Sequence, residues 1–320
     1  MTFAGSPDRA EARLVPEAGY ELDTFRSVGL PRRPGVALLR AFVKVAGAPA
    51  ACLKILRRRR PDVVLGGGGY VSGPMVLAAG ARGTPAAVME ADAHLGLANR
   101  LTAPFAERVF LALPVAGRDD AKYRVTGRPV PRRARPVDRV DARRAFELPP
   151  EEPVLLVLGG SQGARALNEL AVECWAEDGP AVLHLCGERD YEQLGARVAR
   201  ADYRLLPFTD EIGAAYGAAD LALARAGGGV WELAAAGLPA VLVPYPHATA
   251  DHQTKNARHF EAAGGSLVVP ESELARVAPL VSELLADPER RERMSAAMKR
   301  VSRPEAAREI AEELIALASA

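Results

Sequence analysis

The chain has 320 residues, of which 49% are apolar and 25% are charged, so it can build large cores and is not intrinsically disordered. Its formal net charge of +1 offers no bulk attraction to nucleic acid, and we expect no nucleic-acid partner. The three cysteines form no Cys-x-x-Cys pair and the N-terminus has no signal-peptide pattern, which indicates a reduced cytoplasmic setting.

Short apolar runs alternate with helix-period segments along the whole chain. In the first half, strands are expected at residues 2–4, 20–25, 63–65, 86–89 and 109–113. In the second half, strands are expected at residues 154–158, 182–185, 203–206, 221–224, 240–243 and 266–269. This alternation predicts parallel sheets with right-handed crossovers in two α/β domains. Their ligands are expected beyond the carboxyl ends of the strands, in a cleft between the domains.

A Pro- and Arg-rich stretch at 127–136 marks the expected domain boundary. It divides the chain into an N-terminal domain at 1–130 and a C-terminal domain at 131–303. Residues 304–320 are expected to form an amphipathic helix that packs on a domain surface, with the N-terminal domain as the candidate.

Residues 34–60 combine an apolar helix pattern, interrupted by Pro49, with four arginines at its end. One interpretation is an interfacial element whose apolar side chains, including Leu38, Leu39 and Phe42, face an anionic membrane. The other is a buried helix with its arginines in water at the C-terminal end, where cations are favoured.

Two polar loops follow strands of the first half. Four glycines at 66–69 indicate a closely approached binding loop, and Ser72 and Pro74 are expected at the start of the next helix. The stretch at 90–100 gathers polar side chains, in which His94 is a candidate general base and a carboxylate could accept a hydroxyl proton. A structural alternative for the second loop is helix capping by Asp92.

The stretch at 154–168 predicts a buried strand, a glycine turn and a helix whose N-cap is Ser161. Free backbone N–H groups and the helix dipole at such a turn can bind a diphosphate. It is neither a GxGxxG fingerprint nor a Walker loop, and an ordinary tight turn is the alternative.

The strand–glycine–helix pattern recurs at 225–237, where Glu232 lies about one turn into the helix. A carboxylate there can accept two hydrogen bonds from a ribose diol, or can simply compensate the helix dipole. A third polar loop at 243–257 carries Gln253, which can bind hydroxyl groups, and Asn256. We expect Ser161, Glu232 and Gln253 to converge on one site.

Together, the motifs at 68–74, 159–165, 232–239 and 247–257 resemble the MurG family over essentially the whole chain. That resemblance implies a GT-B fold, in which two Rossmann-like domains face a cleft. It implies inverting transfer of N-acetylglucosamine from UDP-N-acetylglucosamine to the 4-hydroxyl of lipid I, giving lipid II in peptidoglycan synthesis. It implies a peripheral enzyme at the cytoplasmic face of the cell membrane, with no metal motif and no tightly bound cofactor. Other peptidoglycan-synthesis proteins are candidate partners.

The resemblance also assigns residues. Those of the donor site are Ser161, Gln162, Gly163, Thr209, Gly228, Gly229, Glu232, His252 and Gln253. Those on the acceptor side are Gly69, Tyr70, Ser72, Glu90 and Asn99. The 34–60 segment matches the family's apolar, basic-rimmed membrane patch.

Four departures from the family pattern matter. The family opens with a Gly-Gly-Thr-Gly-Gly-His loop, whereas this sequence starts at what resembles the second strand, so a gap is expected in the N-terminal sheet. The family's proposed catalytic histidine lies in that loop, which leaves Asp92, an asparagine in the family, and His94 as candidates for the base. The family's donor-contacting arginine is displaced, with Arg132 as the candidate, and the glycine loop before Glu232 is one residue short.

Two other functions remain open on the sequence. One is an inactive UDP-sugar-binding fragment that arises from a misassigned start codon or from decay. The other is a UDP-N-acetylglucosamine 2-epimerase, which shares the GT-B fold.

Overall fold

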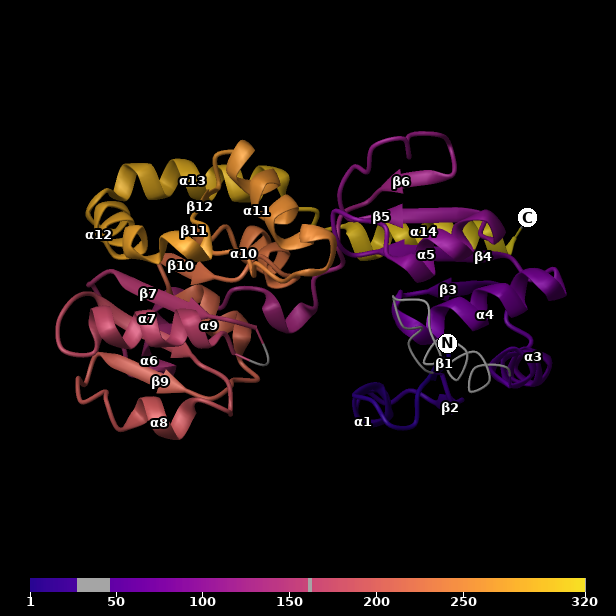
Figure 1. Cartoon of the computed structure of the whole chain (residues 1–320), viewed down its shortest axis with the longest axis horizontal. Helices are drawn as coiled ribbons and strands as arrows, with labels where there is room; N and C mark the ends of the chain where they lie inside the picture. Colours follow the sequence, from indigo (N-terminus) through magenta and orange to yellow (C-terminus); the bar gives the residue numbers. More distant parts are fainter. Residues whose placement is uncertain (28–46, 161–162, 320) are drawn as a thin grey trace. The chain divides into compact units, whose positions relative to one another are not determined.

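The computed structural model describes residues 1–27, 47–160 and 163–319. The expected membrane-facing side chains of Leu38, Leu39 and Phe42, and the expected donor residues Ser161 and Gln162, lie outside these ranges. The chain divides into two compact units, Met1–Gly127 with Arg308–Ala320, and Arg128–Ala307 (Figure 1).

The first unit consists of short parallel strands and the helices between them. Its strands are β1 (Phe3–Gly5), β2 (Leu22–Thr24), β3 (Val64–Gly66), β4 (Ala86–Glu90), β5 (Arg108–Leu111) and β6 (Tyr123–Val125). Its helices are α1 (Glu11–Glu17), α3 (Ala48–Arg59), α4 (Gly69–Arg82), α5 (Leu97–Thr102) and the 3-10 helix η1 (Ala103–Phe105).

The described strands of the first unit form two separate sheets. Strand β1 pairs in parallel with β2, while β3, β4, β5 and β6 form a second parallel sheet in that order. Both sheets nevertheless share one apolar cluster, to which β1 contributes Ala4 and β3 contributes Val64.

Helix α14 (Ala306–Ala318) packs on the four-stranded sheet of the first unit, as Figure 1 shows in yellow. Ile310 is buried against Ala87 of β4 and Phe110 of β5. Arg108 Nε lies 3.1 Å from a carboxylate oxygen of Glu313, which adds an ion pair beside this apolar contact.

The second unit is a six-stranded parallel sheet with helices on it. Its strands are β7 (Val154–Leu158), β8 (Ala181–Leu185), β9 (Tyr203–Leu206), β10 (Leu221–Ala224), β11 (Ala240–Leu242) and β12 (Ser266–Val268). Its helices are α6 (Arg139–Ala145), α7 (Arg165–Trp175), α8 (Tyr191–Gly195), α9 (Ile212–Ala218), α10 (Gly229–Ala236), α11 (His252–Ala262), α12 (Val277–Ala286) and α13 (Pro288–Val301), with 3-10 helices η2 (Arg132–Ala134), η3 (Thr249–Asp251) and η4 (Glu271–Arg276).

The strand order β12-β11-β10-β7-β8-β9 makes β7 a central strand. All five of its residues are buried, because a central parallel strand is covered on both faces, and this explains its unbroken apolar sequence. From β7 the chain adds β8 and β9 on one side and then returns to place β10 on the other. The order therefore reverses between β7 and β10, at the carboxyl edge where open α/β sheets bind ligands.

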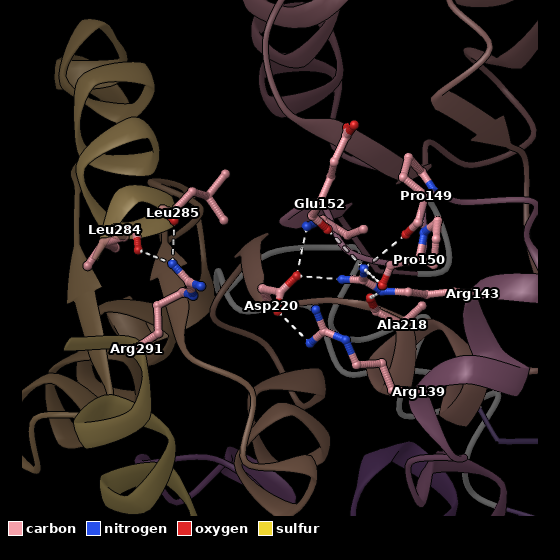
Figure 2. A network of polar contacts seen from close by, with 11 residues as sticks. Arg139, Arg143, Pro149, Pro150, Glu152, Ala218, Asp220, Leu284, Leu285 and Arg291 are labelled. Atoms are coloured by element: carbon pink, nitrogen blue, oxygen red, sulfur yellow. Dashed lines mark hydrogen bonds and ion pairs between the residues drawn. The ribbon is translucent and has the colours of Figure 1, made fainter. Parts of the chain in front are cut away.

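A buried arginine fixes helix α6 to the opposite, amino-terminal edge of this sheet (Figure 2). Arg143 of α6 is 2% exposed at its side chain and pairs with Asp220 at 2.7 Å. Its guanidinium also donates to the carbonyl oxygens of Pro149, Pro150, Glu152 and Ala218. Asp220 in turn accepts from the backbone N–H of Val154 at the start of β7. The charge is thus fully hydrogen-bonded, as a buried guanidinium requires.

The structure corrects the expected starts of two helices. Helix α7 begins at Arg165 with Ala164 as its N-cap, so the cap expected at Ser161 is wrong. Helix α4 begins at Gly69, so Ser72 and Pro74 lie inside it rather than at its cap and first turn. Proline lacks the N–H that would bond to the carbonyl of Tyr70 four residues earlier, and the hydroxyl of Ser27 donates to that carbonyl instead, at 2.8 Å. Pro49 lies in the first turn of α3, where the missing N–H leaves no intrahelical bond unmade.

Candidate functional site

The loops that follow β7 and β10 are neighbours because their strands pair in parallel, with Leu158 opposite Ala224. Each loop leads into a helix, α7 or α10, and no side chain of a described residue caps either N-terminus. Two helix N-termini at one switch point direct free N–H groups and the positive ends of two dipoles toward the same edge of the sheet. That arrangement favours an anionic ligand.

The loop between β7 and α7 depends on glycine. Gly160 and Gly163 have φ angles of +84° and +69°, which side-chain-bearing residues rarely adopt. A Cβ at Gly163 would lie 2.1 Å from the carbonyl oxygen of Cys186, so the loop lies directly against the end of β8. Asn168 of α7 donates to that same carbonyl at 2.8 Å and to Asp190 at 2.9 Å, which holds the two loops together.

An arginine that the sequence analysis did not select lies at the start of α10. A Cβ added at Gly228 would fall 2.3 Å from Nη1 of Arg128, so the guanidinium packs directly on this glycine. Gly228 is the N-cap of α10 and Gly229 its first residue. A cation at the positive end of a helix is unfavourable unless an anion binds beside it. Arg132, the expected donor arginine, lies exposed in η2.

The signal for Arg128 was present in the sequence. It stands directly after Gly127 in the linker that the family pattern also has, at the position next to the expected boundary.

Glu232 lies in the first turn of α10, as predicted. Its carboxylate accepts a hydrogen bond from the hydroxyl of Tyr216 on α9, with 2.7 Å between the two oxygens. Burial, followed by the charge of Glu232, raises the pKa of Tyr216 far above its usual range. The tyrosine is therefore the donor of this bond and Glu232 the acceptor.

The loop after β11 reaches the same edge. Gln253, in the first turn of α11, accepts from the backbone N–H of Tyr245 through Oε1 at 2.9 Å. Its Nε2 lies beside Gly227, where an added Cβ would be 3.8 Å away. His252 contacts the carbonyl of Thr249 through Nδ1 at 2.9 Å. Glu232 and Gln253 thus come from adjacent loops of one sheet, as expected.

Thr209, an expected donor-site residue, and Asn256, expected on the same helix face as Gln253, both make hydrogen bonds near this edge. Thr209 lies in the loop after β9, where its hydroxyl accepts from the backbone N–H of Glu211 at 3.1 Å. Asn256 of α11 is buried and donates to the carbonyl of Ala226 at 3.2 Å, so it supports the glycine loop from below.

On the first unit, the expected acceptor loops follow β3 and β4. Tyr70 is 59% exposed near the start of α4, whereas Ser72 is buried. Gly69 has a φ of +72°. Asn99 of α5 is buried and donates to the carbonyl of Met89 and to Glu90, both at 3.0 Å.

Glu90 is buried at the end of β4 and organises the loop that follows. Its two carboxylate oxygens accept from the backbone N–H groups of Asp92 at 3.3 Å and Gly96 at 2.7 Å. Asp92 and His94 are half-buried on the loop between these bonds. Asp92 is not the N-cap of α5, because that position belongs to Gly96. Glu90 therefore fixes the loop that presents the two candidate bases.

Within the described ranges, no three His, Cys, Asp or Glu side chains gather as a metal-binding group. In the same residues, no helix is both long enough and apolar enough to cross a membrane.

Comparisons with known proteins match both halves of the chain. Residues 2–111 match the glycosyltransferase family 28 N-terminal domain, and residues 154–313 match the glycosyltransferase family 28 C-terminal domain. The chain belongs to glycosyltransferase family 28. The resemblance predicted from the sequence is thereby confirmed.

Two curated relatives of this family 28 chain are both named UDP-N-acetylglucosamine–N-acetylmuramyl-(pentapeptide) pyrophosphoryl-undecaprenol N-acetylglucosamine transferase. The relative from Salinibacter ruber is 40% identical and the match covers 99% of this chain and 88% of the relative. The one from Nocardioides sp. is 42% identical, with coverages of 93% and 84%.

A solved structure of MurG from Acinetobacter baumannii matches with a TM-score of 0.75 and 28% identity, covering 98% of this chain and 90% of that one. The predicted GT-B fold class is confirmed. UDP-GlcNAc 2-epimerase from Neisseria meningitidis has a TM-score of 0.64 at 15% identity, with both chains covered to 98%, which shows a shared fold alone.

Proposed function

We propose that this chain transfers N-acetylglucosamine from UDP-N-acetylglucosamine to the 4-hydroxyl of the muramoyl sugar in lipid I, giving lipid II. The observation that carries the proposal is the near-full-length similarity to relatives named for this transfer. The anion-favouring switch point of the second unit, with Glu232 and Gln253 at its edge, supports the donor half of the reaction.

In this proposal the diphosphate of the donor binds at the glycine loops. Backbone N–H groups near Gly163 and the dipoles of α7 and α10 stabilise its charge, together with Ser161 and Gln162. Gly228 and Gly229 allow close approach to the start of α10, and Arg128 takes the part expected of Arg132.

The sugar and nucleoside ends have separate partners. Glu232 accepts hydrogen bonds from the ribose diol, and the backbone at Thr209 reads the uracil. His252 and Gln253 contact the transferred sugar from the start of α11.

The chemistry is a direct displacement. The acceptor oxygen bonds to the anomeric carbon as the bond from that carbon to the β-phosphate oxygen breaks, and UDP leaves with the electron pair. The configuration inverts because attack and departure occur on opposite faces of the sugar. Asp92 or His94, on the loop fixed by Glu90, accepts the hydroxyl proton. Gly69, Tyr70, Ser72 and Asn99 border this acceptor side.

We further propose a peripheral location at the cytoplasmic face of the membrane, where lipid I is anchored. On the described surface, Leu97, Leu101 and Phe105 are spaced by four residues and are 52%, 55% and 54% exposed. This spacing places Leu97 and Leu101 on one face of α5, and Phe105 follows in η1. Arg100, three residues after Leu97, is also exposed. An apolar stripe with an adjacent cation suits an anionic lipid surface.

Titration calorimetry with UDP tests the donor site. Glu232→Ala should weaken binding by about 10- to 100-fold, because hydrogen bonds to a charged group are lost. Glu289→Ala is the matched control, since Glu289 also lies in a first turn, that of α13, and is 87% exposed at its side chain. Equal UDP affinity of the two variants would contradict the assignment of Glu232.

A further inference from the structure

Tyr216 is a buried tyrosine whose hydroxyl donates a hydrogen bond to the side chain of Glu232. It lies on α9, is 4% exposed, and contacts a side chain of the neighbouring helix α10. The contact is the 2.7 Å hydrogen bond to Oε2 of Glu232. Glu232 itself is half-buried.

The direction of this bond follows from the surroundings of the tyrosine. Burial and the nearby carboxylate both favour the neutral phenol, so the O–H group donates and the carboxylate accepts. A glutamate side chain has three rotatable bonds, and in a site open to solvent these would leave its oxygens unfixed. The bond from Tyr216 removes most of this freedom before a ligand arrives.

We propose that Tyr216 is a positioning residue for ribose recognition: it holds the carboxylate of Glu232 in one orientation, with Oε1 directed to the hydroxyls of a nucleoside diphosphate. Among the described residues, Tyr216 is the hydrogen-bond partner assigned to this carboxylate. This inference rests on the proposed function, because it takes Glu232 as the ribose-binding group. It adds a residue whose contribution to affinity is indirect and specific to the diol.

The variant Tyr216→Phe removes the hydroxyl and keeps the ring that fills the core. Its affinity for UDP should fall about tenfold, because ligand binding must then order a glutamate side chain that is no longer held in place. Its affinity for 2′,3′-dideoxy-UDP should be unchanged, since that nucleotide has no diol for Glu232 to bind. In a Glu232→Ala background, Tyr216→Phe should change UDP affinity less than twofold, because the group it positions is absent.

Tyr203→Phe is the matched control for loss of a buried tyrosine hydroxyl in the same unit. Tyr203 is 3% exposed and its hydroxyl lies 2.9 Å from Nδ1 of His184, on strands β8 and β9 rather than at α10. The variant Tyr203→Phe should therefore have the same ratio of UDP affinity to dideoxy-UDP affinity as the unsubstituted chain.

The outcomes separate the two levels of the proposal. An unchanged UDP affinity in Tyr216→Phe, or an equal loss for both nucleotides, would overturn the positioning role. So would a tenfold loss that persists in the Glu232→Ala background. An unsubstituted chain that binds neither nucleotide would instead overturn the proposed function.

Discussion

Gly163→Ala should damage the glycine loop far more than the same change at Gly160. Both residues have positive φ angles, which costs about 1 kcal/mol for a residue with a Cβ. At Gly163 the new Cβ would also lie 2.1 Å from the carbonyl oxygen of Cys186, whereas at Gly160 nothing lies within 4 Å. Overpacking against backbone adds about 2 kcal/mol, so we expect about 3 kcal/mol of destabilisation at Gly163 and about 1 kcal/mol at Gly160.

Tryptophan fluorescence during thermal unfolding measures this difference. The two tryptophans, Trp175 of α7 and Trp231 of α10, are both buried in the second unit, so the signal reports that unit alone. For a unit of this size, 1 kcal/mol corresponds to about 2–4 °C, so Gly163→Ala should melt roughly 10 °C lower and Gly160→Ala roughly 3 °C lower. Equal melting temperatures for the two variants would refute the close contact between the loop and β8.

Three further predictions concern other parts of the chain. Burial lowers the pKa of His184 to about 3, so the folded state does not take up the proton that the unfolded state binds below its ordinary pKa. Stability should therefore fall by about 2 kcal/mol between pH 6.5 and pH 5, and denaturant titrations of His184→Gln should show a correspondingly weaker pH dependence. In the same titrations, Arg143→Met should lower the free energy of unfolding by about 4 kcal/mol, because Asp220 loses its buried partner. The control Arg144→Met, at a side chain 75% exposed, should change it by less than about 0.5 kcal/mol. Similar losses for both variants would contradict the role of the Arg143–Asp220 network. Replacing Leu101 and Phe105 by Ser should reduce sedimentation of the protein with anionic vesicles without changing its UDP affinity. The control Leu14→Ser, at another exposed leucine, should change neither property. Undiminished vesicle binding of the double variant would contradict a membrane role for α5 and η1.

The strands that the sequence predicted best are those buried on both faces. Residues 154–158 form β7 at the expected positions because every side chain there is covered, which requires an unbroken apolar run. Strand β6 (Tyr123–Val125) was missed. It pairs only with β5 among the described strands and leaves Val125 exposed, so its short edge sequence carries no apolar pattern.

The position of a site residue could be predicted where a sequence motif marks both the end of a strand and the start of the next helix. Glu232 lies in the first turn of α10 for this reason. Helix starts within glycine runs were not predictable. Ser72 was expected as a cap, but the helix begins at Gly69, and the hydroxyl of Ser27 donates to the carbonyl that Pro74 leaves without an intrahelical partner. Contacts between distant segments, such as Tyr216 with Glu232, leave no spacing signal in one sequence.

Transfer of labelled N-acetylglucosamine from UDP-N-acetylglucosamine to lipid I in detergent micelles tests the central claim most directly. The account predicts that label enters the lipid acceptor with release of one UDP per sugar, and that Glu232→Ala lowers the yield while Glu289→Ala does not. Consumption of the UDP-sugar by epimerisation or hydrolysis without a labelled lipid product would contradict it.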